Sequence, residues 1–579
     1  MVHRFRGSSK RALTIALGLC VLCTLFLISP YAFEKGTDGR QLHEDLAYDL
    51  PFAAPSAGSF QLNQPPEQQD ALRQQQQVLH EQKPVAADSH QNHLDDDEDE
   101  DEDEAVEDDG LPTEYKDDLL PSESRQKLKF KIGAQALRSF LTPTVQAERR
   151  VAVGYILRQA NNAYRNQTVY SVVRKPASKI PPSGDRHDYS SLARYFWRNP
   201  DTKDGLPYVR WDGKPNPEMD SVWDYRLMRK MFRDCVFMGQ AYFWTGEERY
   251  AEKIVYRVKE WFLDEETKMN PNLKYGSLIF GHDLGRAQGV LDMFKVYGMF
   301  DALKMIEGSR AMSSEPTLIS DLQTWFTDYL DWIDSSVQAE QERNAKNNHG
   351  TYFSVQYVAI LEFLGLTKEA KQYCEEAKET RLRPQLQHNG AQPHETARPI
   401  SFFYSTFNLQ GLMLLAMQAE AHGVDLWHYK APKEELVVHF NKKTSKKLKM
   451  GGATIEDAVW FVSDYATRDL SEWPYPDSGT RDLPDVLKMA KIAKLVYGQG
   501  NRPWKKMIVK LEEKILQDKL EKEANEADQD EDKDNNVAED EDEEKKEAKD
   551  EEADDNEDTN GFLCELGVLS KGSLWHCYK

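Results

Sequence analysis

The sequence of 579 residues has little cysteine for its length and no pattern of metal ligands. Cys235 and Cys374, two of its six cysteines, fall on apolar faces of expected helices, and only Cys564 and Cys577 have a spacing that permits a disulfide in an oxidising compartment. A chain this long can bury a large core without disulfides. No Cys and His spacing matches a zinc site, and no phosphate-binding loop or nucleic-acid-binding motif is present. The sequence therefore argues against a disulfide framework and predicts no metal, no cofactor and no nucleic-acid partner.

Long apolar runs are also scarce, and the clearest one lies at residues 12–28. Four basic residues within residues 1–11 precede it, the arrangement of a secretory signal peptide or a signal anchor. Its 17 residues are at the short end of a membrane span, and the positive flank predicts a cytoplasmic N-terminus with the remainder in the lumen or outside. Residues 29–33 also offer a cleavage site, so residues 1–33 form either a single-pass anchor, which we favour, or a cleaved signal peptide. Either outcome places the chain in the secretory pathway, anchored in the membrane or secreted, and the sequon at Asn166 fits luminal exposure.

Large apolar residues are few in two further segments, residues 34–125 and 516–560. Residues 95–109 hold 13 acidic side chains, and residues 523–558 hold 21 against four lysines. Such segments cannot bury enough apolar surface to offset the entropy of ordering, so we expect a disordered acidic and Gln-rich stem, a disordered acidic tract and a short tail at 561–579. The two acidic stretches carry about −30 of a formal net charge of −24, so the remainder is near +6. A mildly basic folded region suits a polyanionic substrate.

Alternating polar and apolar patterns, which are typical of strands, are scarce between residues 126 and 515, whereas helical periodicity is frequent. Helices are expected at residues 222–244, 248–262, 284–303, 318–336, 369–381, 401–421, 454–468 and 483–498. Polar loops that contain Gly and Pro join them. Paired helices of this length predict an all-α domain at 126–515, a stack or a toroid, with function carried by the loops at one rim.

Three hydrogen-bonding side chains come together in residues 347–356, which read Asn-Asn-His-Gly-Thr-Tyr-Phe-Ser-Val-Gln. Asn347, Asn348 and His349 stand where an apolar helix begins. Adjacent asparagines at a helix start are often no more than an N-cap, and a histidine there is often structural. Only a combination with other polar groups makes this stretch a candidate site.

A second polar cluster supplies that combination. Residues 394–404 open the helix expected at 401–421 and contain Arg398 and Tyr404. If the two helix starts face one cleft, the set suits β-elimination on a uronic acid, because charge develops on the carboxylate when the C5 proton leaves and amides, arginine or protonated histidine neutralise it. His and Tyr can take the proton from C5 and give one to the departing O4. This chemistry needs no metal or cofactor.

Residues 347–356 and 398–409 resemble the two signature motifs of the alginate lyase family of polysaccharide lyases. Three further segments are similar to family motifs and stand in family order, at residues 183–197, 206–218 and 269–281. Arg186 stands where the family usually has Lys, and Gly-Ser-Leu-Ile-Phe-Gly at 276–281 replaces a different family sequence. The resemblance spans roughly residues 150–480 and implies the incomplete α/α toroid of the alginate and chondroitin lyases, flanked here by the acidic segments.

The resemblance also implies roles for individual residues. Asn348 and Arg398 would bind and neutralise the C5 carboxylate, His349 would assist or act as the base, and Tyr404 would protonate the glycosidic oxygen. In mannuronate and glucuronate the C5 proton and O4 lie on one side, so Tyr404 could serve as base and acid; in guluronate His349 would be the natural base. Polar or aromatic residues in the matching segments are expected to contact the sugars: His187, Tyr189, Tyr208, Arg210, Asn216, Glu218, Arg286, Asn347 and Gln356.

These residues predict a carbon–oxygen lyase that cleaves a uronic-acid polymer such as alginate or glucuronan. Two other classes stay open. An inverting glycoside hydrolase would need two opposed carboxylates, for which Asp212, Glu218, Asp283 and Glu395 are available. A catalytically silent carbohydrate-binding surface protein would fit the anchor and the acidic stem, but it would not need His349 and Tyr404 together.

Overall fold

The computed structural model describes residues 143–534, with gaps at 212–213, 441–443, 480, 499 and 501, and side chains within residues 153–521 of that range. The α-helices are α5 (Pro143–Arg165), α6 (Asp224–Thr245), α7 (Glu248–Phe262), α8 (Val296–Met305), α9 (Arg310–Ser314), α10 (Leu318–Ser335), α11 (Val337–Asn344), α12 (Asn348–Phe363), α13 (Thr367–Ala377), α14 (Arg383–Gln385), α15 (Pro393–Thr396), α16 (Ser401–Ala421), α17 (Ile455–Ala466), α18 (Leu483–Tyr497) and α19 (Trp504–Asp534). Short 3-10 helices are η2 (Val172–Arg174), η3 (Ala177–Lys179), η4 (Pro217–Ser221), η5 (Ala287–Met293) and η7 (Leu470–Glu472), and η6 (Lys378–Leu382) is a π-helical turn.

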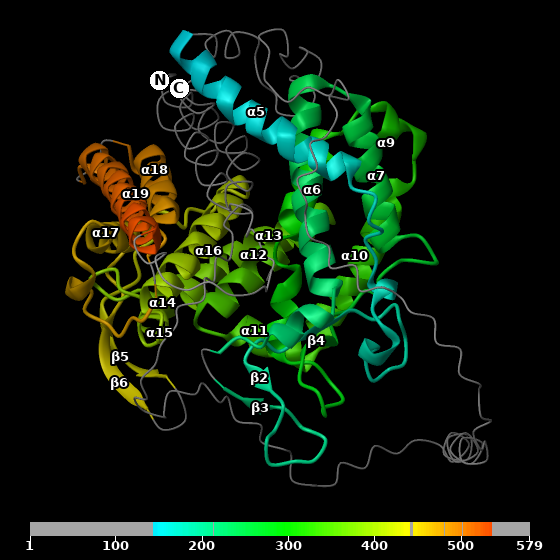
Figure 1. Cartoon of the computed structure of the whole chain (residues 1–579), viewed down its shortest axis with the longest axis horizontal. Coiled ribbons are helices and arrows are strands. Elements are labelled where there is room, and N and C mark those ends of the chain that lie inside the picture. Colours follow the sequence, from blue (N-terminus) through cyan, green and yellow to red (C-terminus); the bar gives the residue numbers. More distant parts are fainter. Residues whose placement is uncertain are drawn as a thin grey trace, which may run out of the picture. The chain divides into compact units, whose positions relative to one another are not determined.

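Helices that follow one another in the chain pack against one another. α5 packs on α6, α6 on α7 and α8, and α16, α17, α18 and α19 pack in series, which Figure 1 follows from cyan to red. One hydrophobic cluster runs through these helices, from Val153 in α5 to Leu511 in α19. The all-α prediction is confirmed, and the serial packing of helices is that of an α/α toroid.

Most predicted helix boundaries agree with the structure to within two residues, as for α6, α7, α10, α16, α17 and α18. The helix expected at 284–303 is instead divided into η5 and α8, with Arg286 as the N-cap residue of η5. The helix expected at 369–381 begins earlier, at Thr367, and ends as the π-helical turn η6. Periodicity located the apolar faces correctly because it reports burial, but it does not report where a helix changes its winding.

Six short strands form three two-stranded sheets in the described residues. β1 (Ser190–Leu192) pairs in parallel with β4 (Tyr275–Leu278), β2 (Phe196–Trp197) pairs with β3 (Val209–Arg210), and β5 (Glu434–His439) forms an antiparallel hairpin with β6 (Ser445–Met450). The β5–β6 hairpin was not expected from the sequence. Leu436 and Val438 alternate towards the less exposed face of β5, as in an ordinary strand. The lysines of β6, however, give residues 445–450 the composition of a polar loop.

Several predictions fall outside the described residues: the signal or anchor at 1–33, the stem at 34–125, the tail at 561–579 and the Cys564–Cys577 pair. Within residues 143–534, no helix is both long and apolar enough to cross a membrane. The last helix, α19, continues past the boundary expected at 516 and ends at Asp534. Its polar surface includes an ion pair one turn apart, between Lys514 and Asp518, which supports a helix without burying it.

Candidate active site

The first cluster stands at the start of α12. Asn347 is the N-cap residue, and its Oδ1 accepts a hydrogen bond from the backbone N–H of His349 at 3.2 Å. Asn348 and His349 therefore occupy the first turn, where backbone N–H groups lack partners within the helix and the helix dipole favours negative charge. The N-cap interpretation holds for Asn347, whereas Asn348 is 3% exposed and His349 is partly exposed.

Gly350, the next residue of the motif, lets α11 approach α12 closely. A Cβ at Gly350 would lie 2.0 Å from the carbonyl oxygen of Ala345, directly after α11, so any other residue would push that segment away. The approach brings Glu342 of α11 to His349, whose Nδ1 lies 2.8 Å from Glu342 Oε2. Glu342 is 3% exposed, so a buried carboxylate faces one ring nitrogen of His349. That contact favours the tautomer with hydrogen on Nδ1 and leaves Nε2 free to accept a proton.

Glu395 joins the second cluster to the first. It lies in the short helix α15 and is 1% exposed. Its Oε1 accepts a hydrogen bond from the backbone N–H of Asn348 at 2.6 Å, and its Oε2 accepts one from Asn348 Nδ2 at 2.7 Å. Because a carboxylate accepts both bonds, the amide of Asn348 must present its Nδ2 to Glu395, and its Oδ1 points elsewhere.

The electrostatic surroundings of Glu395 connect it to the remaining residues. Burial raises the pKa of Glu395, and the two hydrogen bonds from Asn348 and the charges of Arg398 and His349 oppose that rise. Glu395 is thus the common neighbour of Asn348, His349 and Arg398. The hydrogen bonds of Glu395 connect the start of α12 with the segment that precedes α16, and the expectation that the two helix starts face one cleft stays a prediction.

Arg398 and Tyr404 flank the start of α16. Arg398 Nη2 donates a hydrogen bond to the Tyr404 hydroxyl at 3.0 Å, and the guanidinium carbon lies 3.9 Å from the centre of the Tyr404 ring. Both side chains are partly exposed, unlike Glu395. The helix that carries Tyr404 packs directly on α12, and Gly411 makes this possible because a Cβ there would lie 2.8 Å from a methyl group of Thr351.

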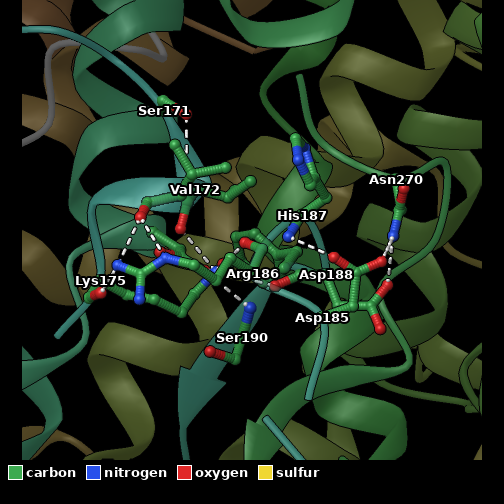
Figure 2. A network of polar contacts seen from close by, with 12 residues as sticks. Ser171, Val172, Lys175, Asp185, Arg186, His187, Asp188, Ser190 and Asn270 are labelled. Atoms are coloured by element: carbon green, nitrogen blue, oxygen red, sulfur yellow. Dashed lines mark hydrogen bonds and ion pairs between the residues drawn. The ribbon is translucent and has the colours of Figure 1, made fainter. Parts of the chain in front are cut away.

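The early loop that was expected to contact substrate surrounds a buried lysine (Figure 2). Lys175 Nζ donates to the carbonyl oxygens of Val172, Arg186 and Asp188 and pairs with Asp224 at 2.9 Å, and neither side chain of the pair is exposed. Arg186, which replaces the usual Lys, donates to the carbonyls of Val173 and Lys175. The loop is therefore held against residues 173–175 by side chains that donate to backbone carbonyls in both directions.

The predicted sugar contact His187 belongs to this loop. Its Nδ1 lies 2.6 Å from the carbonyl oxygen of Lys268, and its backbone N–H donates to Asp185. Asn270 Nδ2 donates to both Asp185 and Asp188, which fixes the loop against the segment that follows α7 (Figure 2). His187 is partly exposed, so its role as a sugar contact stays a prediction.

Three further predicted contacts, Tyr208, Asn216 and Glu218, lie beside the β2–β3 hairpin. Tyr208 is 6% exposed, and its hydroxyl donates to Glu218 at 2.6 Å, which together with burial raises the pKa of Tyr208 to about 12. Burial alone would raise the pKa of Glu218. The hydrogen bond from the Tyr208 hydroxyl and the charges of Lys179 and Arg198 outweigh burial, so the pKa of this carboxyl is lowered. Asn216 is the N-cap residue of η4 and donates to the Phe196 carbonyl.

The two predicted arginines of this region come from different elements. Arg210 belongs to β3, opposite Phe196 of β2 in the sheet register. The guanidinium of Arg286, at the start of η5, lies 4.9 Å from the centre of the Phe196 ring. η5 in turn contacts both α11 and α12, so Arg286 begins an element that packs on the helix of Asn348.

Two predicted contacts have no exposed surface. Tyr189 is 0% exposed and donates its hydroxyl to Asp292 at 2.9 Å, while burial raises the pKa of Asp292 to about 6. Gln356 is 0% exposed and donates to the Tyr329 hydroxyl at 3.5 Å. These positions pack inside the helical domain, and a direct sugar contact by either stays a prediction without support from its burial.

The carboxylates that the hydrolase alternative would use have different surroundings in the structure. Glu395 is buried against Asn348, Glu218 is paired with Tyr208, Lys179 and Arg198, Asp283 lies in an exposed turn, and Asp212 falls in a gap of the structure. The sequence contained Glu395 and Glu342, but no spacing rule indicated that each would bind a residue of the Asn-His motif. Among the described residues no group of three or more His, Cys, Asp or Glu side chains could hold a metal ion.

Comparison with known proteins agrees with this geometry. The family model described as alginate lyase matches residues 172–439, which include every residue of the candidate site. An alginate lyase from Bacteroides ovatus is 30% identical, with a TM-score of 0.56, and the match covers 68% of this chain and 94% of that one. Alginate lyase A1-III from Sphingomonas species A1 is 14% identical, with a TM-score of 0.35, and covers 62% of this chain and 92% of its own. No curated protein matches the chain.

Proposed function

Because this chain belongs to the alginate lyase family of polysaccharide lyases, we propose that it cleaves a uronic-acid polymer, alginate, glucuronan or a similar one, by β-elimination. The observation that carries the proposal is the Arg398–Tyr404 contact beside the α12 start, with Nη2 and Oη 3.0 Å apart. It places a permanent cation against the hydroxyl that is best suited to move a proton. Neither a hydrolase nor a silent binding protein needs that pairing.

The first step is neutralisation of the substrate carboxylate. Removing the C5 proton moves charge onto the carboxylate at C5, so donors in place before the reaction stabilise the transition state. Arg398 is a permanent cation whose Nη2 donates to Tyr404, and Asn348 keeps a second N–H on Nδ2 beyond the one given to Glu395. The position of Asn348 at the positive end of α12 adds to the effect.

Proton transfer falls to Tyr404 and His349. When the C5 proton and O4 lie on one side of the ring, Tyr404 as phenolate takes the proton and returns it to O4, and Arg398 stabilises the phenolate. When they lie on opposite sides, His349 Nε2 takes the proton, since Glu342 holds Nδ1, and Tyr404 protonates O4. In both cases the C4–O4 bond breaks, a C4–C5 double bond forms and no water is consumed.

The test uses the full-length protein with polymannuronate, polyguluronate and glucuronan in turn, and follows the ultraviolet absorbance of the C4–C5 double bond. Tyr404→Phe keeps the ring beneath Arg398 and removes the hydroxyl, so kcat should fall by roughly 10²-fold or more. His349→Gln should abolish activity on a guluronate polymer but leave part of it on a mannuronate or glucuronate polymer.

Tyr256→Phe is the matched control, because Tyr256 is an exposed tyrosine on α7 whose hydroxyl donates to Glu260 at 2.8 Å. It should keep full activity. New reducing ends without ultraviolet absorbance would refute elimination, and an unimpaired Tyr404→Phe enzyme would refute the role of Tyr404.

A further inference from the structure

Two lysines beside the candidate site have no acidic partner in the described part of the chain. Lys346 is exposed and precedes the N-cap residue Asn347, so it stands at the entrance to the motif. Its charge acts on His394, whose pKa is lowered to about 4 by burial first and by Lys346 second. Lys346 therefore lies near the segment that carries Glu395, as well as near its own helix start.

The second lysine is on the β5–β6 hairpin and is linked to the same histidine through the ring of Phe440. Lys446 Nζ lies 5.9 Å from the centre of the Phe440 ring, and the Phe440 ring lies 5.9 Å from the ring of His394. His394 directly precedes Glu395, which binds Asn348. The hairpin is thus connected to the candidate site through Phe440 and His394.

Lys447, the next residue of β6, differs from Lys446 in the face of the hairpin that it occupies and in having an acidic partner. Lys446 is opposite Val438 in the sheet register and Lys447 is opposite Val437, so the two lysines point to opposite faces of the hairpin. Lys447 is paired with Glu435 at 2.6 Å, and its face also carries Val437, which is 57% exposed. Lys446, unlike Lys447, is not paired with an acid among the described residues.

We propose that Lys346 and Lys446 form an anion-binding extension of the candidate site that binds carboxylates of uronate units beyond the one at which elimination occurs. The proposal rests on the proposed function and deepens it, because it names the substrate as a polyanion that is held over several units. Charge complementarity selects this ligand: each unit of a polyuronate carries one carboxylate, and the two lysines offer exposed cations in the surroundings of His394. His394 itself is buried and neutral at neutral pH, so it adds no charge to the extension.

The test compares Lys346→Gln, Lys446→Gln and the double variant with Lys447→Gln, the control on the opposite face. On a long polyuronate, each of the first two should raise KM about two- to fivefold with little change in kcat, since exposed ion pairs contribute modestly. The double variant should also flatten the dependence of KM on salt, because fewer charge pairs are left to screen. Lys447→Gln should have the KM of the wild type. On the shortest oligosaccharide that is still cleaved, all four variants should have the same kcat/KM as the wild type.

Binding is measured separately by electrophoresis through a gel that contains the polyuronate, which requires no catalysis. If the wild type is retarded and Lys446→Gln is not, the extension exists even when no elimination is detected, so failure of the proposed function is distinguishable. Equal effects of Lys446→Gln and Lys447→Gln would overturn the proposal. An equal loss on the shortest substrate would overturn it too, because the lysines would then act at the reacting unit.

Discussion

Replacement of Glu395 by Gln tests whether the buried carboxylate holds the catalytic amide in place. The substitution keeps the volume and one acceptor oxygen, but it puts an NH₂ group opposite one of the two donors of Asn348, which lie 2.6 and 2.7 Å from the present oxygens. Hydrogen bonds to charged groups contribute about 1.5–3 kcal/mol, and a buried donor left without a partner is costly. We therefore expect the free energy of unfolding to fall by about 2 kcal/mol.

The same change should reach the reaction through Asn348. If the amide turns to avoid the NH₂ group, the second Nδ2 hydrogen no longer points at the substrate carboxylate. Loss of one such donor costs about 3–4 kcal/mol, and partial misalignment costs less, so kcat should fall by roughly 10- to 100-fold. KM should change little, because Glu395 is 1% exposed and does not touch substrate.

The pH dependence gives an independent check with a definite sign. Burial raises the pKa of Glu395, so acidification protonates it above the usual range of a glutamate. The protonated acid resembles Gln in having one acceptor and one donor. Wild-type kcat should therefore decline as the pH falls through this raised pKa, and in Glu395→Gln that part of the decline should be absent.

Glu260→Gln is the matched control. Glu260 is 2% exposed and accepts hydrogen bonds from the backbone of Tyr170 and from Arg257, on helix α7 and far along the chain from the motifs. It should lower stability by at least as much, because it also removes the charge that pairs with the buried Arg257, and it should leave kcat unchanged. If Glu395→Gln loses stability like the control but keeps wild-type kcat, the carboxylate is only structural and our account of Asn348 is wrong.

Three other substitutions follow from the same contacts. On any polymer for which His349 is the base, Glu342→Gln should lower kcat several-fold and change its pH profile, measured by ultraviolet absorbance. Glu342→Asp should keep part of the wild-type kcat. Lys175→Met should cost about 3–5 kcal/mol in chemical denaturation, because it strands the buried Asp224. In the wild type, the lowered pKa of His394 means that the unfolded chain binds this proton first, so the contribution of His394 to stability is complete above about pH 6.5 and is lost as the pH falls towards 4. His394→Gln should remove that part of the pH dependence of the melting temperature.

The sequence predicted the parts of this fold that depend on local pattern. The helix that starts at Asn348 and the helix of residues 401–421 were both predicted, since apolar spacing and polar helix starts are visible in a short stretch. The β5–β6 hairpin was missed because lysines occupy its outer positions. The division of residues 284–303 into η5 and α8 was missed because winding depends on neighbouring elements and not on periodicity alone.

The site shows the same division between local and long-range information. Asn348, His349, Arg398 and Tyr404 could be chosen from the sequence because each lies at a helix start with side chains suited to elimination. The partners that orient them could not be chosen, since Glu395 is 47 residues from Asn348 and belongs to the other cluster. A carboxylate near a sugar-cleaving site suggests an acid catalyst when only the sequence is known, and Glu395 was accordingly a candidate for a hydrolase.

Burial distinguishes a carboxylate that acts as a catalytic acid from one that orients another side chain. A hydrolase acid must reach the glycosidic oxygen or a water, whereas Glu395 spends both oxygens on Asn348 and is closed off from solvent. Glu342 is likewise buried and spends its Oε2 on His349. In the proposed mechanism these acids orient protein groups, and the cations, amide, imidazole and phenol act on the sugar, because an exposed carboxylate beside the C5 position would repel the substrate carboxylate and oppose the charge that elimination builds there.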